Sequence, residues 1–197
     1  METSAVIAAS RQGALRRQLE IVANNLANMS TNGYKSSQMM FVEHVVKSEG
    51  GERLISPKLT YTRDIATRTD ITDGAIETTG NPLDLAIRND GFFVVRDGQG
   101  QEFFTRNGQL GKLWIVRFEN QQDLVRTSGA LFTSEKAPID VGSPDVIQGS
   151  LEGSNVEPIL EMAKMIELHR SYESAKSFIE REDERMKEMI RGLAREA

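Results

Sequence analysis

Both ends of the chain carry apolar residues at the three- and four-residue spacing of an amphipathic helix. Near the start, one apolar stripe is interrupted only by the polar Gln12, and it consists of Ala8, Leu15, Leu19, Val22, Leu26 and Met29. This spacing places the side chains on one face of a helix. The segment 30–33 is predicted to end the helix, because Gly33 tolerates the left-handed backbone of a helix exit.

A longer stripe follows Pro158, a residue suited to the first turn of a helix, with Ser154 or Asn155 as the expected cap. Its positions alternate steps of three and four, and they are Met165, Leu168, Tyr172, Ala175, Ile179, Glu182, Met186, Met189 and Leu193. A heptad pattern that continues for about four repeats is typical of coiled-coil packing. The charged run 180–185 is interpreted as the solvated outer face of this helix.

Between the ends, helical periodicity fades after about Lys47, and short β-rich pieces alternate with turn residues. The predicted strands include residues 59–62, 71–72, 83–87, 92–95 and 114–118. Asp90-Gly91 and Asp97-Gly98 are predicted hairpin turns. We therefore predict an α+β fold, in which the N- and C-terminal helices pair as a coiled-coil-like layer with a β-rich insert between them. The predicted domains are the N-terminal helix of an inner domain (1–35), a β-rich linker and outer domain (36–148), and the C-terminal helix of the inner domain (149–197).

Composition narrows the class of protein by exclusion. Of the 197 residues, 39% are hydrophobic and 27% are charged, which fits neither a disordered chain nor a membrane protein. The net charge of −5 argues against general nucleic-acid binding, and the absence of cysteine excludes disulfides and thiolate sites. The apolar run 5–9 follows Glu2 and precedes no convincing cleavage site, so we expect a start without a removable signal.

No catalytic, metal-binding or cofactor-binding residue is predicted. The only histidines, His44 and His169, lack the spacing of metal ligands. No serine lies in a nucleophile elbow, and Gly98-Gln99-Gly100 lacks the strand-then-helix setting of a phosphate-binding loop. We therefore expect a protein that is not an enzyme and needs no cofactor.

An asparagine-rich helix end is the sharpest local signal. Asn24, Asn25 and Asn28 lie within five residues, although asparagine is a poor helix former whose amide both donates and accepts hydrogen bonds. Either they serve as ordinary capping residues, or they form a polar cluster that bonds neighbouring chains or an adjoining loop. The spacing alone favours neither interpretation.

Four ordered blocks that contain these residues resemble the signatures of the flagellar rod and hook family. They are Ala23-Asn24-Asn25-Leu26-Ala27-Asn28 with Thr31 and Gly33-Tyr34-Lys35; residues 79–87 with 90–95; Phe104-Thr105-Arg106-Asn107-Gly108; and residues 149–156 with 161–162 and 165–166. Within the family, residues 80–84 and 39–44 look most like the proximal-rod member, and the distal-rod member is the runner-up. One departure occurs at Leu110-Gly111, where a few tens of residues of the family's β-domain are missing. Either the outer domain is reduced or a segment is omitted from the sequence, and the match on both sides favours the second.

The resemblance implies a hollow tube whose inner layer is formed by the terminal helices, with a β-rich outer domain. It also implies unfolded export through the flagellar type III apparatus without a cleaved signal, and a place in the periplasmic rod of the basal body. The implied partners are other rod proteins and copies of this chain, with no nucleic acid and no direct insertion into the membrane.

We therefore predict a structural subunit of the basal-body (proximal) rod that self-assembles through its terminal helices and transmits torque. The residues predicted to form the inter-subunit interface are Leu15, Leu19, Val22, Leu26, Asn24, Asn25, Asn28, Met165, Leu168, Tyr172, Ile179 and Met186. The alternatives are a distal-rod or hook-type axial subunit, a coiled-coil adaptor that forms a discrete dimer, and a hydrolase of the cell wall. The last would need a catalytic dyad that the sequence does not supply.

Overall fold

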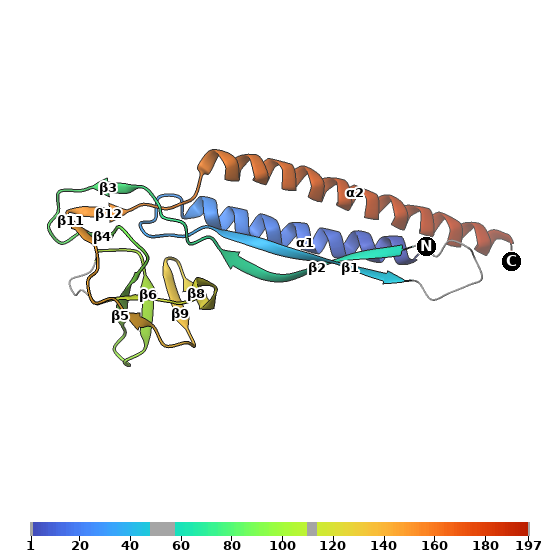
Figure 1. The fold of residues 1–197 in the computed structure, drawn as a ribbon. Coiled ribbons are helices and arrows are strands. Elements are labelled where there is room, and N and C mark those ends of the chain that lie inside the picture. The colour runs from blue at the N-terminus through green and yellow to red at the C-terminus, as the bar shows by residue number, and fades with distance from the viewer. Residues whose placement is uncertain (1, 48–57, 110–113, 197) are drawn as a thin grey trace. The chain divides into compact units, whose positions relative to one another are not determined.

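The fold is a β-rich middle between two long helices (Figure 1). The computed structural model describes residues 2–47, 58–109 and 114–196. Within these ranges the elements are α1 (Glu2–Ala27), β1 (Ser37–Lys47), β2 (Lys58–Thr69), β3 (Ile76–Thr78), β4 (Leu85–Ile87), β5 (Phe92–Arg96), β6 (Glu102–Thr105), β7 (Ile115–Arg117), η1 (Gln121–Asp123), β8 (Leu124–Ser128), β9 (Leu131–Ser134), β10 (Ile139–Asp140), β11 (Val146–Gln148), β12 (Ser150–Glu152) and α2 (Pro158–Glu196). This order confirms the predicted α+β class. The predicted break at Leu110-Gly111 lies outside the described residues.

Both predicted helices are present, and their ends follow local chemistry. α1 ends at Ala27, before the predicted stop at residues 30–33, and Gly33 with its φ of 68° lies in the turns beyond the helix. α2 begins at Pro158, as predicted, because proline lacks the N–H that the first turn leaves unbonded. The predicted caps are wrong. The Ser154 hydroxyl accepts from the backbone of Val156, and the side chain of Asn155 bonds to other segments.

The strand predictions were right where pairing agrees with local propensity. The turn at Asp97-Gly98 does join an antiparallel hairpin, formed by β5 and β6. Asp90-Gly91 is not a hairpin turn, because β4 pairs with β11 while β5 pairs with β6 and β7. Residues 71–72 lie outside any strand, and the helical period read as far as Lys47 is wrong, since β1 begins at Ser37. Whether each of these segments forms a strand therefore depends on pairing with residues that are distant in the sequence.

The largest sheet has six antiparallel strands in the order β10-β7-β5-β6-β9-β8. Two smaller sheets, β4 with β11 and β3 with β12, bring the segment before α2 back to the segment after β2. β1 and β2 form a separate two-stranded sheet. The chain therefore returns, just before α2, to a place beside residues that precede the main sheet.

The apolar run at Phe92-Phe93 supplies both faces of the main sheet. Successive side chains of a strand point to opposite faces, so a strand buried on both sides reads as a continuous apolar run. Phe92 packs edge-on against Phe118 and Phe132, with ring centroids 6.1 and 6.0 Å apart. Phe93 belongs to the second cluster, with Leu85, Ile87 and Ile115. Two small cores thus fix β5 in the middle of the sheet.

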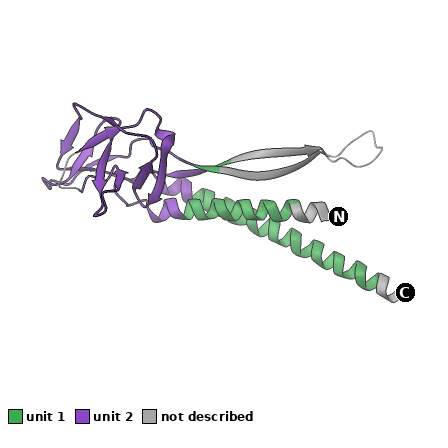
Figure 2. Cartoon of the chain, turned by 90° about the horizontal axis from the view of Figure 1, so that it is seen from below, with its two compact units in different colours: residues 1–23, 39–67, 162–197 green, residues 24–38, 68–161 purple. Residues whose placement is uncertain are grey.

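The described chain divides into two compact units (Figure 2). Unit 1 comprises residues 1–23, 39–67 and 162–197, and unit 2 comprises residues 24–38 and 68–161. Unit 1 contains most of α1 and α2, while unit 2 contains the sheets from β3 onward, the last turn of α1 and the first turn of α2. The division into domains 1–35, 36–148 and 149–197 stays a prediction.

Candidate functional site

The end of α1 is built from the three asparagines, and each has a different role. Asn28 donates through its Nδ2 to the backbone oxygen of Asn24 at 2.8 Å and to the Oδ1 of Asn24 at 3.0 Å. The Thr31 hydroxyl donates to the Oδ1 of Asn28 at 3.2 Å. These bonds satisfy polar groups at the helix terminus and hold the turn after it.

Asn25 ties this turn to both neighbouring segments. Its side chain is buried, and its Oδ1 accepts from the Ser37 N–H at 2.9 Å while its Nδ2 donates to the Ser37 carbonyl at 2.9 Å. The same Nδ2 donates to Oε2 of Glu161 in the first turn of α2 at 3.1 Å. The amide thus uses two N–H donors and an acceptor together, whereas an ionised carboxylate has no donor and a hydroxyl has only one. Asparagine at position 25 links the end of α1, the start of β1 and the start of α2.

Tyr34, in the turn that follows α1, bonds to two of the asparagines. Its buried hydroxyl lies 3.1 and 3.2 Å from the side-chain oxygens of Asn24 and Asn25, and the guanidinium of Arg126 lies 4.4 Å from its ring centroid. Burial raises the pKa of the Tyr34 hydroxyl, and the positive charge of Arg126 partly opposes that rise. Arg126 also donates to the backbone oxygen of Lys35, so β8 is joined to the same segment.

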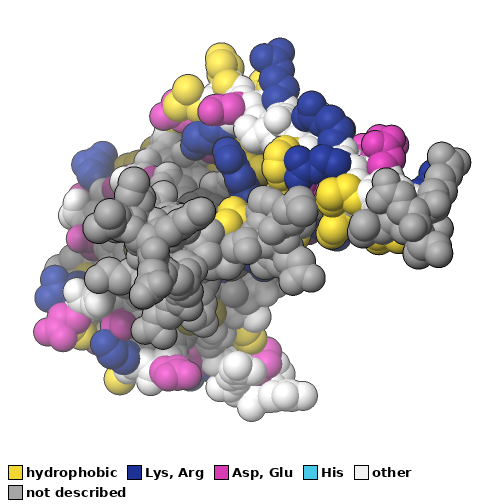
Figure 3. Space-filling model, turned by 90° about the vertical axis from the view of Figure 1, so that its right-hand side faces the viewer, with side chains coloured by type: hydrophobic (Ala, Val, Ile, Leu, Met, Phe, Trp, Pro, Cys, Tyr) yellow, Lys and Arg dark blue, Asp and Glu magenta, His cyan; other side chains and the backbone are white. Residues whose placement is uncertain are grey.

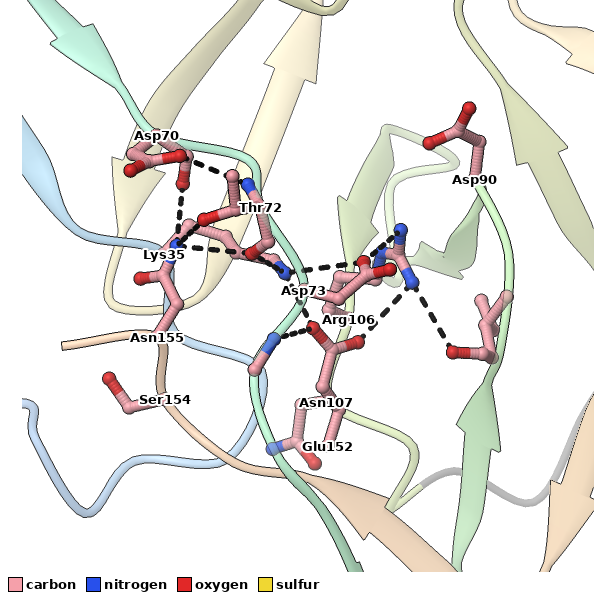
Figure 4. Close-up of polar contacts among 12 residues, drawn as sticks. Lys35, Asp70, Thr72, Asp73, Asp90, Arg106, Asn107, Glu152, Ser154 and Asn155 are labelled. Atoms are coloured by element: carbon pink, nitrogen blue, oxygen red, sulfur yellow. Dashed lines mark hydrogen bonds and ion pairs between the residues drawn. The ribbon is translucent and has the colours of Figure 1, made fainter.

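Directly after Tyr34 lies a buried charge cluster, formed by Lys35, Asp73, Arg106 and Glu152 (Figure 4). Lys35 Nζ lies 2.5 Å from Oε1 of Glu152, and Arg106 Nη1 lies 3.3 Å from Oε2 of the same carboxylate. The side chains of Lys35, Arg106 and Glu152 are almost completely shielded from solvent, whereas Asp73 is about half exposed. Arg106 Nη2 forms an ion pair with Asp73 at 3.2 Å. Two positive and two negative charges make the cluster neutral.

Glu152 is the centre of this cluster, because its carboxylate also accepts from the backbone N–H of Gly74 at 3.0 Å. Lys35 donates in addition to the carbonyl of Thr72 at 2.7 Å. Burial lowers the pKa of the Lys35 ammonium, and the adjacent carboxylate of Glu152 opposes that shift. A buried ammonium keeps its charge only where such partners replace water.

Asn155 forms hydrogen bonds to two of the same segments, at Ser36 and at residues 70–72. Its Oδ1 accepts from the Ser36 N–H at 2.6 Å, and its Nδ2 donates to the carbonyls of Asp70 and Thr72 at 3.0 and 3.1 Å. The backbone of Gly33 donates to the carbonyl of Glu152 at 2.8 Å. We call the whole arrangement the junction, defined as residues 24–37, 70–74, 105–108 and 149–161, all of which belong to unit 2.

Two glycines allow the junction strands to approach closely. A Cβ on Gly33 would lie 2.3 Å from the backbone nitrogen of Asn107, and its φ of 68° already disfavours a side chain. A Cβ on Gly108 would lie 1.6 Å from the carbonyl oxygen of Leu85. Glycine at position 33 is therefore a condition for bringing residues 33–35 next to Asn107, and glycine at position 108 is a condition for the approach to Leu85 at the start of β4.

The structure places the predicted interface residues as follows. The three asparagines bond within the chain, which favours the adjoining-loop interpretation over simple capping. Of the apolar positions, Leu15 and Val22 are buried, Met186 is exposed, and those that are half-buried are Leu19, Leu26, Met165, Leu168, Tyr172 and Ile179. Along α2 up to Glu182, these half-buried positions form one face, and most of the residues between them are exposed. Their contact with other subunits stays a prediction.

Sequence reasoning did not select the charged members of the junction as site residues. Lys35, Arg106 and Glu152 all lay inside the family-like blocks, yet each is an ordinary surface residue type in a turn-rich context. The available signal was one charged residue in each of three family-like blocks, with Arg106 next to Asn107, Glu152 next to Gly153 and Lys35 two residues after Gly33.

Neither a candidate metal-binding cluster nor a candidate membrane-spanning helix is found among the described residues. No cluster of three or more His, Asp or Glu side chains within residues 2–47, 58–109 and 114–196 is arranged to hold a metal ion. No helix in the same ranges is long and apolar enough to cross a bilayer.

Replacing Asn25 with aspartate is expected to lower the free energy of unfolding by about 2–4 kcal/mol, because a carboxylate would face the Ser37 carbonyl and the Glu161 carboxylate. Thermal or urea unfolding of the full chain measures this. The matched control is Asn24→Asp, because the Oδ1 of Asn24 only accepts hydrogen bonds, from Asn28 and Tyr34. This substitution is expected to change the free energy of unfolding by less than about 1 kcal/mol. Equal effects of the two substitutions would contradict the bonding described for Asn25.

Comparison with known proteins gives matches at both ends of the chain. Residues 7–35 match the family described as "Flagella basal body rod protein", and residues 147–191 match "Flagellar basal body rod FlgEFG protein C-terminal". The rod protein FlgF of Caulobacter vibrioides is 27% identical over 99% of this chain and 99% of its own length. The rod protein FlgG of Agrobacterium fabrum is 27% identical over 90% of this chain and 94% of its own. The hook protein FlgE of Salmonella typhimurium is 32% identical over 77% of this chain, which covers 33% of the hook protein.

The lengths of these alignments bear on the break expected in the outer domain. The alignment with the Caulobacter protein runs over 245 positions, whereas this chain has 197 residues. The relative therefore has a few tens of residues without a counterpart here, in agreement with the amount predicted to be missing.

Proposed function

We propose that this chain, which belongs to the flagellar rod and hook family as a structural subunit of the basal-body rod, self-assembles through its terminal helices and transmits torque. Apolar side chains that α2 leaves uncovered support the proposal more than any other observation. Ile159, Ile166 and Ile190 of α2 are 79, 56 and 66% exposed. Figure 3 shows hydrophobic side chains between Lys and Arg side chains on the face turned to the viewer. Burial of such surface yields about 25 cal/mol per Å² and is the natural driving force for subunit contacts.

The junction supports the mechanical part of the proposal. Torque carried by the helices has to be transmitted to the sheets of unit 2 through a rigid connection. Four segments distant in sequence meet at the junction through charged and amide side chains that are bonded to one another. Such a connection resists local opening better than a bare loop, because several buried bonds would have to break together.

The partners we propose are other axial proteins of the flagellum and copies of this chain. We propose a non-catalytic role and a place in the periplasmic rod, reached by export without cleavage of the N-terminus. The mass of the subunit from purified basal bodies tests this route, since a shortened N-terminus would argue against it. The distal rod is the alternative place for this subunit within the rod. Imaging of basal bodies with a tagged subunit distinguishes the two.

Placing aspartate in the half-buried face of either helix is expected to abolish assembly and motility. Leu19→Asp and Ile179→Asp each put a charge where apolar contact is required, at a cost of several kcal/mol in a buried seam. The readouts are swimming in soft agar and the amount of subunit in isolated basal bodies. Ser177→Asp is the matched control, because it adds the same charge at an exposed position two residues from Ile179. Normal motility of the Leu19 and Ile179 variants would refute the proposed use of this face.

A further inference from the structure

Asparagine followed by glycine occurs twice in the chain, at Asn32-Gly33 and at Asn107-Gly108. Both dipeptides belong to the junction, and their backbones approach closely there, since a Cβ on Gly33 would lie 2.3 Å from the nitrogen of Asn107. Both asparagines are half-buried and both glycines are buried. An asparagine side chain can react with the backbone nitrogen of the next residue, and glycine hinders that reaction least because it has no Cβ. The hydrogen bonds around each dipeptide therefore decide how fast it reacts.

The reaction is cyclisation of the asparagine side chain followed by hydrolysis. Hydroxide removes the proton from the glycine N–H, and the nitrogen attacks Cγ of the asparagine. A C–N bond closes a five-membered imide ring, while the bond from Cγ to the side-chain nitrogen breaks and ammonia leaves with a proton taken from water. Water then opens the ring at one of its two carbonyls, which gives aspartate or isoaspartate. Because the imide nitrogen carries no hydrogen, ring closure removes any hydrogen bond that the glycine N–H donated.

At Asn32 the structure opposes ring closure. The N–H of Gly33 donates to the carbonyl of Glu152 at 2.8 Å. Glu152 is only 1% exposed, so water does not reach this carbonyl to replace the donor. Ring closure at Asn32 would leave a buried acceptor without a partner, a penalty that slows the reaction by about tenfold or more.

Asn107 lacks this protection. Its Oδ1 accepts from the N–H of Gln109 at 3.1 Å, a turn in which the side chain folds back over the peptide unit of Gly108. The same bond polarises the Cγ carbonyl and stabilises the negative charge that develops on Oδ1 when Cγ is attacked. Among the residues that the structure describes, none accepts a hydrogen bond from the N–H of Gly108, so ring closure at this site breaks no such bond.

We propose that Asn107 is a site of spontaneous deamidation in the folded protein, and that the junction protects Asn32 from the same reaction. The reaction needs only water and hydroxide, and it is irreversible once ammonia has left. The two asparagines differ because one neighbouring glycine donates a buried hydrogen bond and the other does not. The junction thus contains one labile and one protected copy of the same dipeptide.

The two products of the reaction have different effects on the junction. Aspartate at position 107 keeps the length of the main chain and an oxygen that can accept from Gln109. Isoaspartate adds one carbon to the main chain, at a place where Gly33 and Gly108 already lie so close to other backbone atoms that a Cβ would not fit. Arg106, the preceding residue, is then displaced from Asp73 and Glu152 (Figure 4). Isoaspartate therefore loosens the charge cluster.

Peptide mapping of aged protein measures the two sites separately. The purified full chain is kept in mildly alkaline buffer, and a second sample is kept in the same buffer with concentrated urea. Trypsin then releases residues 107–112 and 18–35, and tandem mass spectrometry assigns each gain of one mass unit to its asparagine. In the folded chain Asn107 is expected to convert at least about tenfold faster than Asn32, because only Asn32 would lose a buried hydrogen bond. In urea the two rates are expected to be similar.

Equal or reversed rates in the folded chain would overturn the proposal. It would also be overturned if neither asparagine converted in the folded chain while both did so in urea. A preference for Asn107 that remained unchanged in urea would show that the local sequence, and not the junction, makes this site labile.

The variant Asn107→Asp separates the new charge from the lengthened main chain. It carries the charge of the product on a normal backbone, so its urea midpoint is expected to lie close to that of the unsubstituted chain. Aged protein enriched in isoaspartate at position 107 is expected to unfold at a lower urea concentration than this variant, because only isoaspartate displaces the surrounding backbone. Identical midpoints would refute the proposed effect of isoaspartate on the junction.

Discussion

Replacing Glu152 with glutamine is expected to lower the free energy of unfolding by about 3–5 kcal/mol, the usual cost of removing one partner from a buried ion pair. Glutamine keeps the size of the side chain and an oxygen that can accept from Gly74. It removes the negative charge that Lys35 and Arg106 share at 2.5 and 3.3 Å. The buried cluster would then carry a net positive charge with only the half-exposed Asp73 to compensate it. Urea unfolding of the full chain measures the effect.

Two controls separate the loss of charge from general damage. Glu102→Gln breaks the more exposed pair with Arg96 and is expected to cost less than about 1 kcal/mol. In the double variant Lys35→Met with Glu152→Gln, one charge of each sign is lost, so its cost is expected to fall below the sum of the single costs by about 1–3 kcal/mol. Additive costs would show that the charges in the cluster do not depend on one another.

The effect of Glu152→Gln is also expected to depend on pH. Burial lowers the pKa of Lys35 and Glu152 opposes this, so removing the carboxylate lowers that pKa further. Between the lowered pKa and the ordinary value, the unfolded chain binds more protons than the folded one, and stability rises with pH in that window. The deficit of the variant relative to the unsubstituted protein should therefore shrink as the pH rises toward the ordinary pKa of a lysine. A deficit that grows over that range would contradict the assignment.

Replacing Gly33 with alanine is expected to lower the free energy of unfolding by about 4 kcal/mol or more. The new Cβ would lie 2.3 Å from the backbone nitrogen of Asn107 in a residue whose φ is 68°. Backbone cannot move aside as a flexible side chain can, so the strip 33–35 would have to leave its place. The bond from Gly33 to the Glu152 carbonyl and the position of Lys35 would change with it.

Two other glycines divide this effect into its parts. Gly80 has a φ of 72° but open space around its missing Cβ, so Gly80→Ala should cost only about 1–2 kcal/mol of backbone strain. Gly142 has neither a positive φ nor a neighbour within 4 Å, so Gly142→Ala should be nearly neutral. The ranking Gly33, Gly80, Gly142 is the expected outcome. If Gly33→Ala were no worse than Gly80→Ala, the close approach to Asn107 would not matter.

The helices were predictable because their signals are local. The spacing from Met165 to Glu182 marked the half-buried face of α2, and Pro158 marked its first residue. The same local reasoning failed for Ile71-Thr72 and for Asp90-Gly91, where β-like residues or a turn dipeptide found no matching strand partner. Strand pairing depends on residues far away in the chain, and periodicity within a short window does not contain that information.

By itself the sequence determined the helix–β–helix order, the apolar faces of both helices and a polar helix end at Asn24, Asn25 and Asn28. Only the tertiary structure decided that these asparagines bond within their own chain, and that Lys35, Arg106 and Glu152 meet although 117 residues separate the first from the last. A helix forms from contacts three and four residues apart, and its pattern is written in consecutive residues. A buried charge cluster forms only when folded sheets exclude water from groups that look like ordinary surface residues in the sequence.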